Sequence, residues 1–214
     1  SNEDRISLLF EIDRINKFAT KGCTVVCHVP KGAPNAKDGK FGTSSATEKG
    51  DLWHWKGARS DPAGVADDTY VTVISEKKGG RKGDAGSGGD KKNITADKSK
   101  PMYTLAPGKK LGKHGILLAA DAVEISDYSV FQAGDVVTYR MPKAAAGSRG
   151  DIKAVSSYAD GGWTVMLYRK LDTGNEDDVA FNPRKKYSFA MALFDNSGDE
   201  DSYDSEVITL QFKK

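Results

Sequence analysis

Apolar and polar residues alternate along several short stretches of the chain. In the first of them, Ile6, Leu8, Phe10 and Ile12 occupy every second position. A period of two places successive side chains on opposite faces of an extended backbone, so this stretch is predicted to be a strand. Alternation, β-branched content or flanking glycines predict further strands at 51–56, 69–75, 135–140, 151–158, 163–168, 187–194 and 207–212.

The stretches between these strands carry little helical pattern. One helical turn is indicated between Asn16 and Lys21, and no amphipathic helix of 12 residues is found. Short strands joined by long loops predict a mostly β fold, an antiparallel β-sandwich or barrel with a few short helices. No linker separates two cores, so residues 1–214 are expected to form a single domain. Residues 78–100, rich in Gly, Lys and Asp, are expected to be a polar surface loop.

The charged residues of both signs are mixed along the chain. There are 32 Lys and Arg against 30 Asp and Glu, with a formal net charge of +2. No basic stripe is evident, so nucleic acid is not an expected partner. No apolar run approaches the length of a membrane-spanning helix. No signal peptide is visible at Ser1, so the chain is expected to be either cytosolic or already processed.

The chain's two cysteines lie close together, in the stretch Gly-Cys-Thr-Val-Val-Cys-His at 22–28. Three residues separate Cys23 from Cys27, and His28 follows at once. Two thiols can add across the vinyl groups of a haem, and an adjacent histidine can reach the iron. The usual attachment spacing has two residues between the cysteines, one fewer than here. Both thioether anchors and the axial imidazole are nevertheless present.

Other chemistry is open to the same residues. Cys23 and Cys27 could form a short-loop disulfide in an oxidising compartment, with His28 incidental. A zinc site needs four ligands, and the chain has no second Cys or Cys/His pair. A thioredoxin-like site needs a two-residue spacing in a βαβ context. The residues alone therefore leave haem and a disulfide as the two alternatives.

The stretch Asp-Leu-Trp-His-Trp-Lys at 51–56 is the second unusual one. If it is extended, Trp53 and Trp55 share one face and Leu52 and His54 the other. His54 is then either a hydrogen-bonded core histidine or a residue that contacts or ligates a haem.

Two further kinds of chemistry receive weaker support. Asp84, Asp90 and Asn93 could hold Ca²⁺ through oxygen atoms, but their spacing does not match an EF-hand loop. The chain has three histidines and neither a Gly-x-Ser-x-Gly nor a His-Glu-x-x-His motif, which disfavours a hydrolase.

Several blocks of sequence, taken in order, resemble one known family. The chain is similar to the haem-binding domain of the ethylbenzene dehydrogenase γ subunit and of related bacterial cytochromes, the cytochrome c-552/DMSO reductase-like haem-binding family. The most specific blocks are Trp-His-Trp-Lys at 53–56 and the two blocks Trp-Thr-Val and Leu-Asp-Thr-Gly at 163–165 and 171–174. The other matching blocks are 4–5, 22–28, 66–68, 147–154 and 192–196.

This resemblance implies a β-sandwich with haem in a loop-walled pocket, working in periplasmic electron transfer. Members with the Cys-x-x-x-Cys-His segment look like c-type cytochromes, and this chain belongs with those. The implied roles are covalent haem attachment for Cys23 and Cys27 and proximal ligation for His28. Trp53 and Trp55 are expected to pack near the porphyrin.

The distal iron ligand is open at this stage. His54 ranks first because it lies in a specific block, and the alternatives are Met102, His114, Met141 and Lys153. Lys153 could match the lysine ligand of b-type members of the family.

The resemblance implies an electron-transfer haem protein rather than an enzyme. Its redox partner would be a molybdenum oxidoreductase, a quinol-linked cytochrome or another cytochrome. The competing hypothesis is a non-enzymatic β-sandwich binding module with a Cys23–Cys27 disulfide and no haem.

Overall fold

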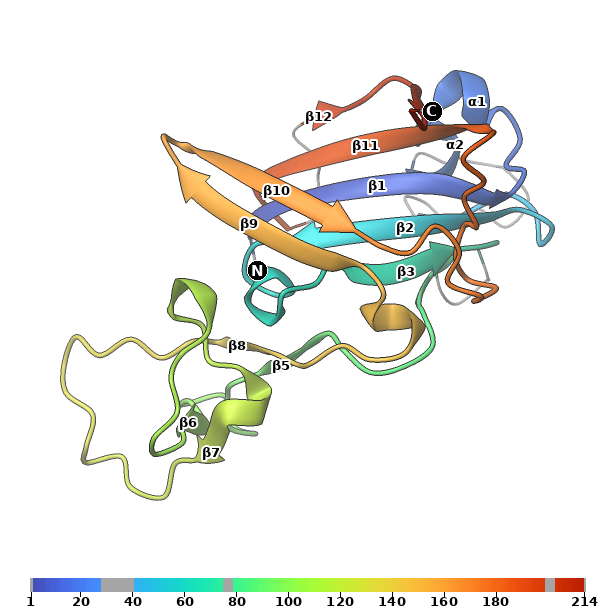
Figure 1. The fold of residues 1–214 in the computed structure, drawn as a ribbon. Coiled ribbons are helices and arrows are strands. Elements are labelled where there is room, and N and C mark those ends of the chain that lie inside the picture. The colour runs from blue at the N-terminus through green and yellow to red at the C-terminus, as the bar shows by residue number, and fades with distance from the viewer. Residues whose placement is uncertain (1, 28–40, 75–78, 199–202, 214) are drawn as a thin grey trace.

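A large antiparallel sheet organises the computed structural model, which describes residues 2–27, 41–74, 79–198 and 203–213 (Figure 1). Its path runs β12-β11-β1-β2-β3-β4, and β13 also pairs with β11. The strands are β1 (Glu3–Asp13), β2 (Lys49–Lys56), β3 (Asp67–Val71), β4 (Arg81–Gly83), β11 (Lys186–Ser197), β12 (Tyr203–Asp204) and β13 (Ile208–Gln211).

A hairpin of β9 (Lys153–Ala159) and β10 (Gly162–Tyr168) lies across one face of this sheet (Figure 1). Its two-residue loop is Asp160-Gly161, with φ of 52° and 77°. Asp-Gly with positive φ at both positions is the preferred tight turn for twisted antiparallel strands. The β-sandwich predicted from the sequence is confirmed.

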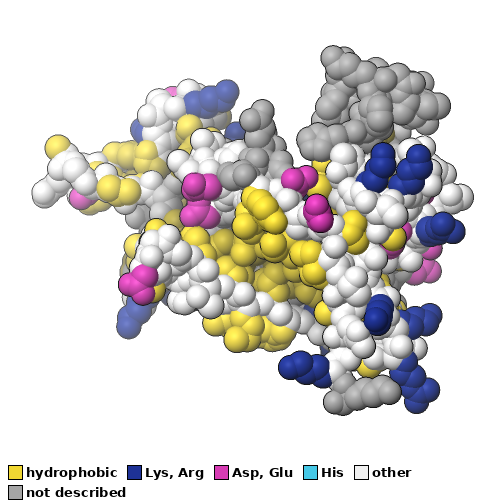
Figure 2. Space-filling view, turned by 90° about the horizontal axis from the view of Figure 1, so that it is seen from above, with side chains coloured by type: hydrophobic (Ala, Val, Ile, Leu, Met, Phe, Trp, Pro, Cys, Tyr) yellow, Lys and Arg dark blue, Asp and Glu magenta, His cyan; other side chains and the backbone are white. Residues whose placement is uncertain are grey.

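The core between hairpin and sheet is called the hairpin-side core. Its buried residues are Phe10, Trp53, Trp55, Ala66, Ile152, Ala154, Val179 and Phe181. The hairpin is narrower than the sheet, so many apolar neighbours from β1, β10, β11 and β13 stay half-buried. Figure 2 shows hydrophobic side chains gathered in a hollow in the middle of one face.

A second core lies on the opposite face of the sheet and is called the cysteine-side core. Two short helices cover it, α1 (Phe18–Lys21) and α2 (Thr24–Cys27). Phe18 and Val26 pack there against Leu9 and Leu52 of the strands. Strands β1 and β2 are therefore buried on both faces, and successive side chains enter different cores.

The segment between β4 and β9 forms smaller elements beside the sandwich (Figure 1). Strand β5 (Asp90–Lys92) pairs with β8 (Arg140–Pro142), and β6 (Tyr103–Leu105) pairs with β7 (Ala122–Glu124). Single 3-10 turns lie at η1 (Asp61–Ala63), η2 (Lys113–Gly115), η3 (Ala119–Asp121) and η4 (Ser148–Gly150). Within the described residues, no helix has the length and hydropathy that crossing a bilayer requires.

Two expectations about this segment were wrong. The polar stretch 78–100 is not only a surface loop, because it contributes β4 and β5 and buries Asp84 and Asn93. The Asn93 amide is buried because it bonds to four backbone groups, two that donate to Oδ1 and two that accept from Nδ2. The strand predicted at 135–140 begins only at Arg140. Val136 is 92% exposed, so burial of its side chain does not stabilise a strand there.

Candidate functional site

The two cysteines bracket one helical turn on the cysteine side. The backbone N–H of Cys27 donates to the carbonyl of Cys23 at 2.7 Å. Residues four apart on a helix are neighbours on one side of it, so the three-residue spacing still brings the side chains together. Cys23 is buried and Cys27 half-buried, and no disulfide joins them. The unusual spacing is thus compatible with two attachment points on a common face.

His54 lies on the same face of the sheet as the cysteines. Cys23 packs in the cysteine-side core with Leu52, and His54 is two residues further along β2. Two residues of strand span about 7 Å and return the side chain to the same face. The His54 ring is buried and stacks on Phe194, with ring centroids 5.8 Å apart.

Arg81 determines which nitrogen of His54 carries the proton. Arg81 Nη2 lies 2.8 Å from His54 Nδ1. A guanidinium has no acceptor, so Nδ1 must accept and the ring proton must sit on Nε2. Burial lowers the pKa of His54 well below 6.5, and Arg81 and Lys56 lower it further, so the ring is neutral. Nε2 is buried and meets no hydrogen-bond partner in the part of the chain that is described.

This tautomer bears on the expectation that His54 is the leading distal ligand, which stays a prediction. Iron needs the lone pair of a ring nitrogen, and here Nδ1 is committed to Arg81 while Nε2 holds the proton. Ligating histidines usually donate their second N–H to a carboxylate or carbonyl, the reverse of the contact seen here. In this arrangement Nε2 of His54 is a buried hydrogen-bond donor, and ligation of iron by His54 would require Nε2 to give up its proton.

A cavity of about 500 Å³ opens beside His54. Six cationic side chains line it: Arg5, Lys56, Arg59, Arg81, Lys82 and Arg149. Among its described lining residues Asp67 is the one acid, paired with Lys56 at 2.6 Å and with Arg149 at 2.8 Å. Burial lowers the pKa of Lys56 to about 8, although Asp67 raises it in part. The cavity is therefore suited to a carboxylate or phosphate, which guanidinium groups bind well.

The two tryptophans do not join this face. Trp53 and Trp55 point into the hairpin-side core, where Trp55 stacks edge-on against Trp163 at 5.0 Å between centroids. The indole N–H of Trp55 donates to Asp61 at 3.0 Å. The alternation of β2 places Trp53 and Trp55 on the opposite face of the sheet from Cys23. Their expected packing near a haem stays a prediction.

The remaining ligand candidates also lie elsewhere. Met141 is buried in β8 and Met102 immediately precedes β6, both in the segment that Figure 1 shows far from α2. Lys153 begins β9 and donates from Nζ to the carbonyl of Gly150 at 2.7 Å. His114 Nε2 contacts Asp61 at 3.1 Å. His28 lies outside the described residues.

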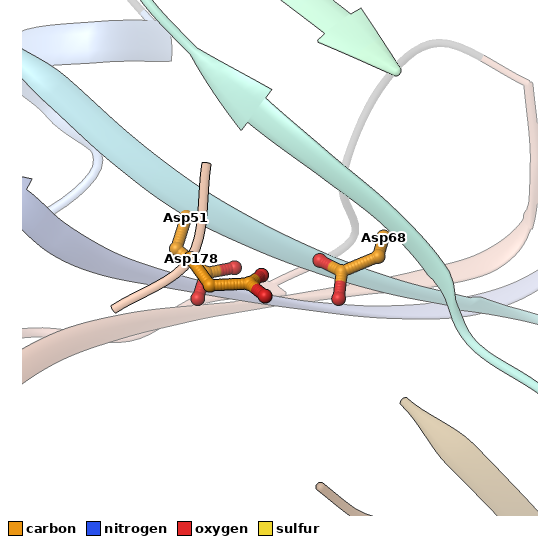
Figure 3. Close-up of side chains that lie close together, drawn as sticks. All are labelled: Asp51, Asp68 and Asp178. Carbon is orange, nitrogen blue, oxygen red and sulfur yellow. The ribbon is translucent and has the colours of Figure 1, made fainter. Parts of the chain in front are cut away.

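The structure shows a second cluster that the sequence did not reveal. Asp51, Asp68 and Asp178 bring their carboxylates together on the hairpin side (Figure 3). Of the residues considered for calcium, only Asp84 lies in a group of this kind, with Asp177 and Asp178.

The other two calcium candidates have different partners. Asp90 pairs with Arg140 at 2.6 Å, and Asn93 binds backbone groups. The acidic run 176–178 was visible in the sequence, but its partners lie more than 90 residues earlier in the chain.

Comparison with known families shows to which family the chain belongs. The family model described as ethylbenzene dehydrogenase matches residues 1–206. The chain belongs to the ethylbenzene dehydrogenase family. No curated protein and no solved structure matches it. The resemblance drawn from the sequence blocks is thus confirmed, and the chain is related to a subunit of a redox enzyme.

Proposed function

We propose that this family member is a periplasmic c-type cytochrome domain that carries one haem and exchanges electrons with a redox partner. Cys23 and Cys27 would hold the haem through thioether bonds, and His28 would be the proximal ligand. The observation that carries the proposal is the position of both cysteines on one helical turn. That turn lies over the same sheet face as His54 and the cationic cavity.

The residues of the cysteine side fit an amphipathic, anionic cofactor. Leu9, Leu52 and Val71 supply an apolar wall beside Cys23. The cationic cavity offers counter-charges for the two propionate groups of a haem. The buried Nε2–H of His54 is a donor that still needs an acceptor, since none of the described residues supplies one.

The haem supplies the one-electron chemistry, and no side chain of this domain is assigned a catalytic role. Burial and hydrogen bonds around the cofactor tune its potential, and these are what the cysteine side contributes. The partner would be a molybdenum oxidoreductase, a quinol-linked cytochrome or another cytochrome. The family name favours a dehydrogenase among these.

A pyridine haemochrome spectrum tests the proposal. The protein is exported from a host that has c-type maturation, and the spectrum is recorded before and after acid-acetone extraction. A reduced α-band that stays with the protein is expected. Colour that leaves with the solvent would replace covalent attachment by a b-type site, and a colourless protein would contradict haem binding altogether.

Two variants sharpen this test. The double variant Cys23→Ala/Cys27→Ala should retain no haem after extraction, because both thioether bonds are lost. His114→Ala is the matched control, since this histidine is part-exposed and contacts Asp61 instead of the cysteine side. It should keep the full band.

A further inference from the structure

Five aspartates gather on the hairpin side of the sheet, away from the cysteines. Asp51 lies on β2, Asp68 on β3 and Asp84 immediately after β4, while Asp177 and Asp178 belong to the loop that follows β10. Asp51, Asp68 and Asp178 have carboxylate oxygens that all lie within 4.8 Å of one another, and so have Asp84, Asp177 and Asp178. Figure 3 shows the carboxylate of Asp68 turned toward those of Asp51 and Asp178.

One buried guanidinium compensates part of this charge. Arg169 Nη1 lies 2.8 Å from Asp51 Oδ2 and 2.8 Å from Asp178 Oδ1, and 3.9 Å from Asp68 Oδ2. Asp177 is satisfied separately, because its oxygens accept from Ser148 and from the backbone of Ala85. Among the described residues, Arg169 is thus the one cation paired with the buried carboxylates of Asp51, Asp68 and Asp178, and buried Asp84 has no ion pair.

Several of these oxygens have no hydrogen-bond donor at all among the described residues. They are both oxygens of Asp68, both of Asp84 and Oδ1 of Asp51. Asp68 is 0% and Asp84 4% exposed, so water does not reach them freely. An ionised carboxylate that is buried without a partner is costly, and native structures rarely leave one so. Bound protons or a bound cation would offset this cost.

Strand pairing forces Asp68 and Asp84 together. Thr69 pairs with Gly83 across β3 and β4, and the backbone N–H of Asp84 lies 3.4 Å from the carbonyl of Asp68. Like charges on neighbouring strands oppose pairing. The sheet therefore holds the carboxylates of Asp68 and Asp84 side by side. Their repulsion opposes this arrangement unless a positive charge lies between them.

We propose that Asp51, Asp68, Asp84 and Asp178 bind a divalent metal ion, and that this ion is Ca²⁺. The donor set consists of oxygen atoms alone, which suits a hard cation and not zinc or copper. Calcium binds six to eight oxygens at about 2.3–2.6 Å, so two of its ligands lie no more than about 5 Å apart. Asp51, Asp68 and Asp178 meet that limit as one group of three, and Asp84 meets it with Asp178 in the second group.

The ion would tie four parts of the chain together. Strands β2 and β3 contribute Asp51 and Asp68, the residue after β4 is Asp84, and the loop after β10 contributes Asp178. That loop also packs Val179 and Phe181 into the hairpin-side core. The site is therefore assigned a structural role, which fixes the loop on the sheet.

Without an ion, protons are the alternative. Burial raises the pKa of Asp68 to about 11, and Asp51 and Asp84 raise it further. Burial and Asp177 raise the pKa of Asp84 to about 8. Metal ions displace such protons, so metal and protons compete for these oxygens.

Thermal unfolding with and without metal tests the proposal on the full chain. The protein is stripped with EDTA, dialysed, and melted with increasing CaCl₂ or MgCl₂. At a hundredfold excess over the dissociation constant, Ca²⁺ should raise Tm by about 5–10 °C. Mg²⁺ should act more weakly, because it releases its water reluctantly and needs near-octahedral geometry. Elemental analysis of protein that is reloaded with CaCl₂ and then dialysed free of excess ion should find one Ca²⁺ per chain.

Asp68→Asn and Asp84→Asn identify the ligands. Both amides match the shape of a protonated carboxyl, so both variants should fold, and both should lose the Ca²⁺-dependent rise in Tm. Asp97→Asn removes an exposed aspartate whose partners are Thr95 and Ser99, and should keep the rise. No rise for the unsubstituted protein, or an equal rise in Asp68→Asn and Asp84→Asn, would overturn the site.

Discussion

Asp67 and Asp68 are consecutive residues of β3 that point to opposite faces of the sheet. Their pKa values shift in opposite directions from the ordinary value. Burial alone would raise the pKa of Asp67, but Lys56 and Arg149 beside it bring the pKa below the ordinary 3.8. Burial raises the pKa of Asp68 to about 11, and Asp51 and Asp84, which it faces, raise it further. The alternation of a strand therefore decides which sign of charge a buried aspartate meets.

Strand β2 repeats this division. His54 and Lys56 face the cysteine side, where burial and neighbouring cations lower both pKa values. Asp51 faces the hairpin side, where burial raises its pKa to about 6, against the attraction of Arg169. Each face concentrates one sign, and each is therefore expected to bind a ligand of the opposite sign: haem carboxylates on one face, a metal ion on the other.

The largest change in unfolding free energy is expected from Arg169→Met, which keeps the side chain long and removes its charge. Arg169 is 1% exposed and holds Asp51 and Asp178. Removing one partner from a buried ion pair costs about 3–5 kcal/mol of unfolding free energy. Urea denaturation in EDTA should show this loss, and Ca²⁺ should restore part of it. Arg184→Met, on an exposed turn, is the control and should change stability little.

A pair of neighbouring variants comes next. Asp67→Asn leaves Lys56 and Arg149 without their carboxylate and should cost about 2 kcal/mol at neutral pH. Asp68→Asn replaces a carboxyl that is already protonated in EDTA, so its cost there should be near zero. Chemical denaturation of both variants measures the difference. Equal losses would show that the two faces do not differ in charge.

The pH dependence of stability sharpens the comparison further. In EDTA, native Asp68 and Asp84 hold protons that the unfolded chain has released above about pH 4, since both pKa values are raised. Their contribution to stability is thus complete below the unfolded pKa and is lost as pH rises toward their native values. Between pH 6.5 and 8.5 the unfolding free energy should fall by about 1 kcal/mol per pH unit for each proton.

Calcium should flatten this profile, because the bound ion replaces the protons. Denaturation series at several pH values, with EDTA and with CaCl₂, provide the measurement. A profile in EDTA that rises with pH over this range would contradict the raised pKa values.

The smallest effect is expected from His54→Gln. Native His54 stays neutral because its pKa is lowered, while the unfolded chain takes up a proton below about 6.5. The wild-type protein therefore loses stability as pH falls below 6.5, by about 1–2 kcal/mol at pH 5. The variant should lose less over the same interval. Denaturation at pH 7 and pH 5 measures the unfolding free energy of both proteins. The same loss of stability in the variant and the wild-type protein would contradict a neutral His54 in the native state.

Much of the sandwich could be predicted from local pattern. The separation of Trp53 and Trp55 from His54 follows from a period of two and needs no knowledge of neighbouring strands. The strand expected at 135–140 begins only at Arg140, because the apolar side chains before it do not pack into a core. Whether an extended segment is buried depends on contacts that the segment itself does not encode.

The candidate sites depended on pairing between distant segments. The aspartate cluster joins Asp51, Asp68 and Asp178, and only the register of β2 against β3 and the path of the later loop bring them together. The tautomer of His54 likewise depends on Arg81, 27 residues further along the chain. The pattern of a single sequence shows that these aspartates, His54 and Arg81 are present, but it does not show which of them lie in contact.

We propose that the sheet separates a haem face from a metal face. Anomalous scattering from crystals of the matured protein, grown with CaCl₂ and recorded across the iron edge and at long wavelength, tests both halves at once. We expect an iron peak beside Cys23 and Cys27 and a calcium peak among Asp51, Asp68 and Asp178, on opposite sides of β2. Iron on the hairpin side, or no peak among the aspartates, would contradict it.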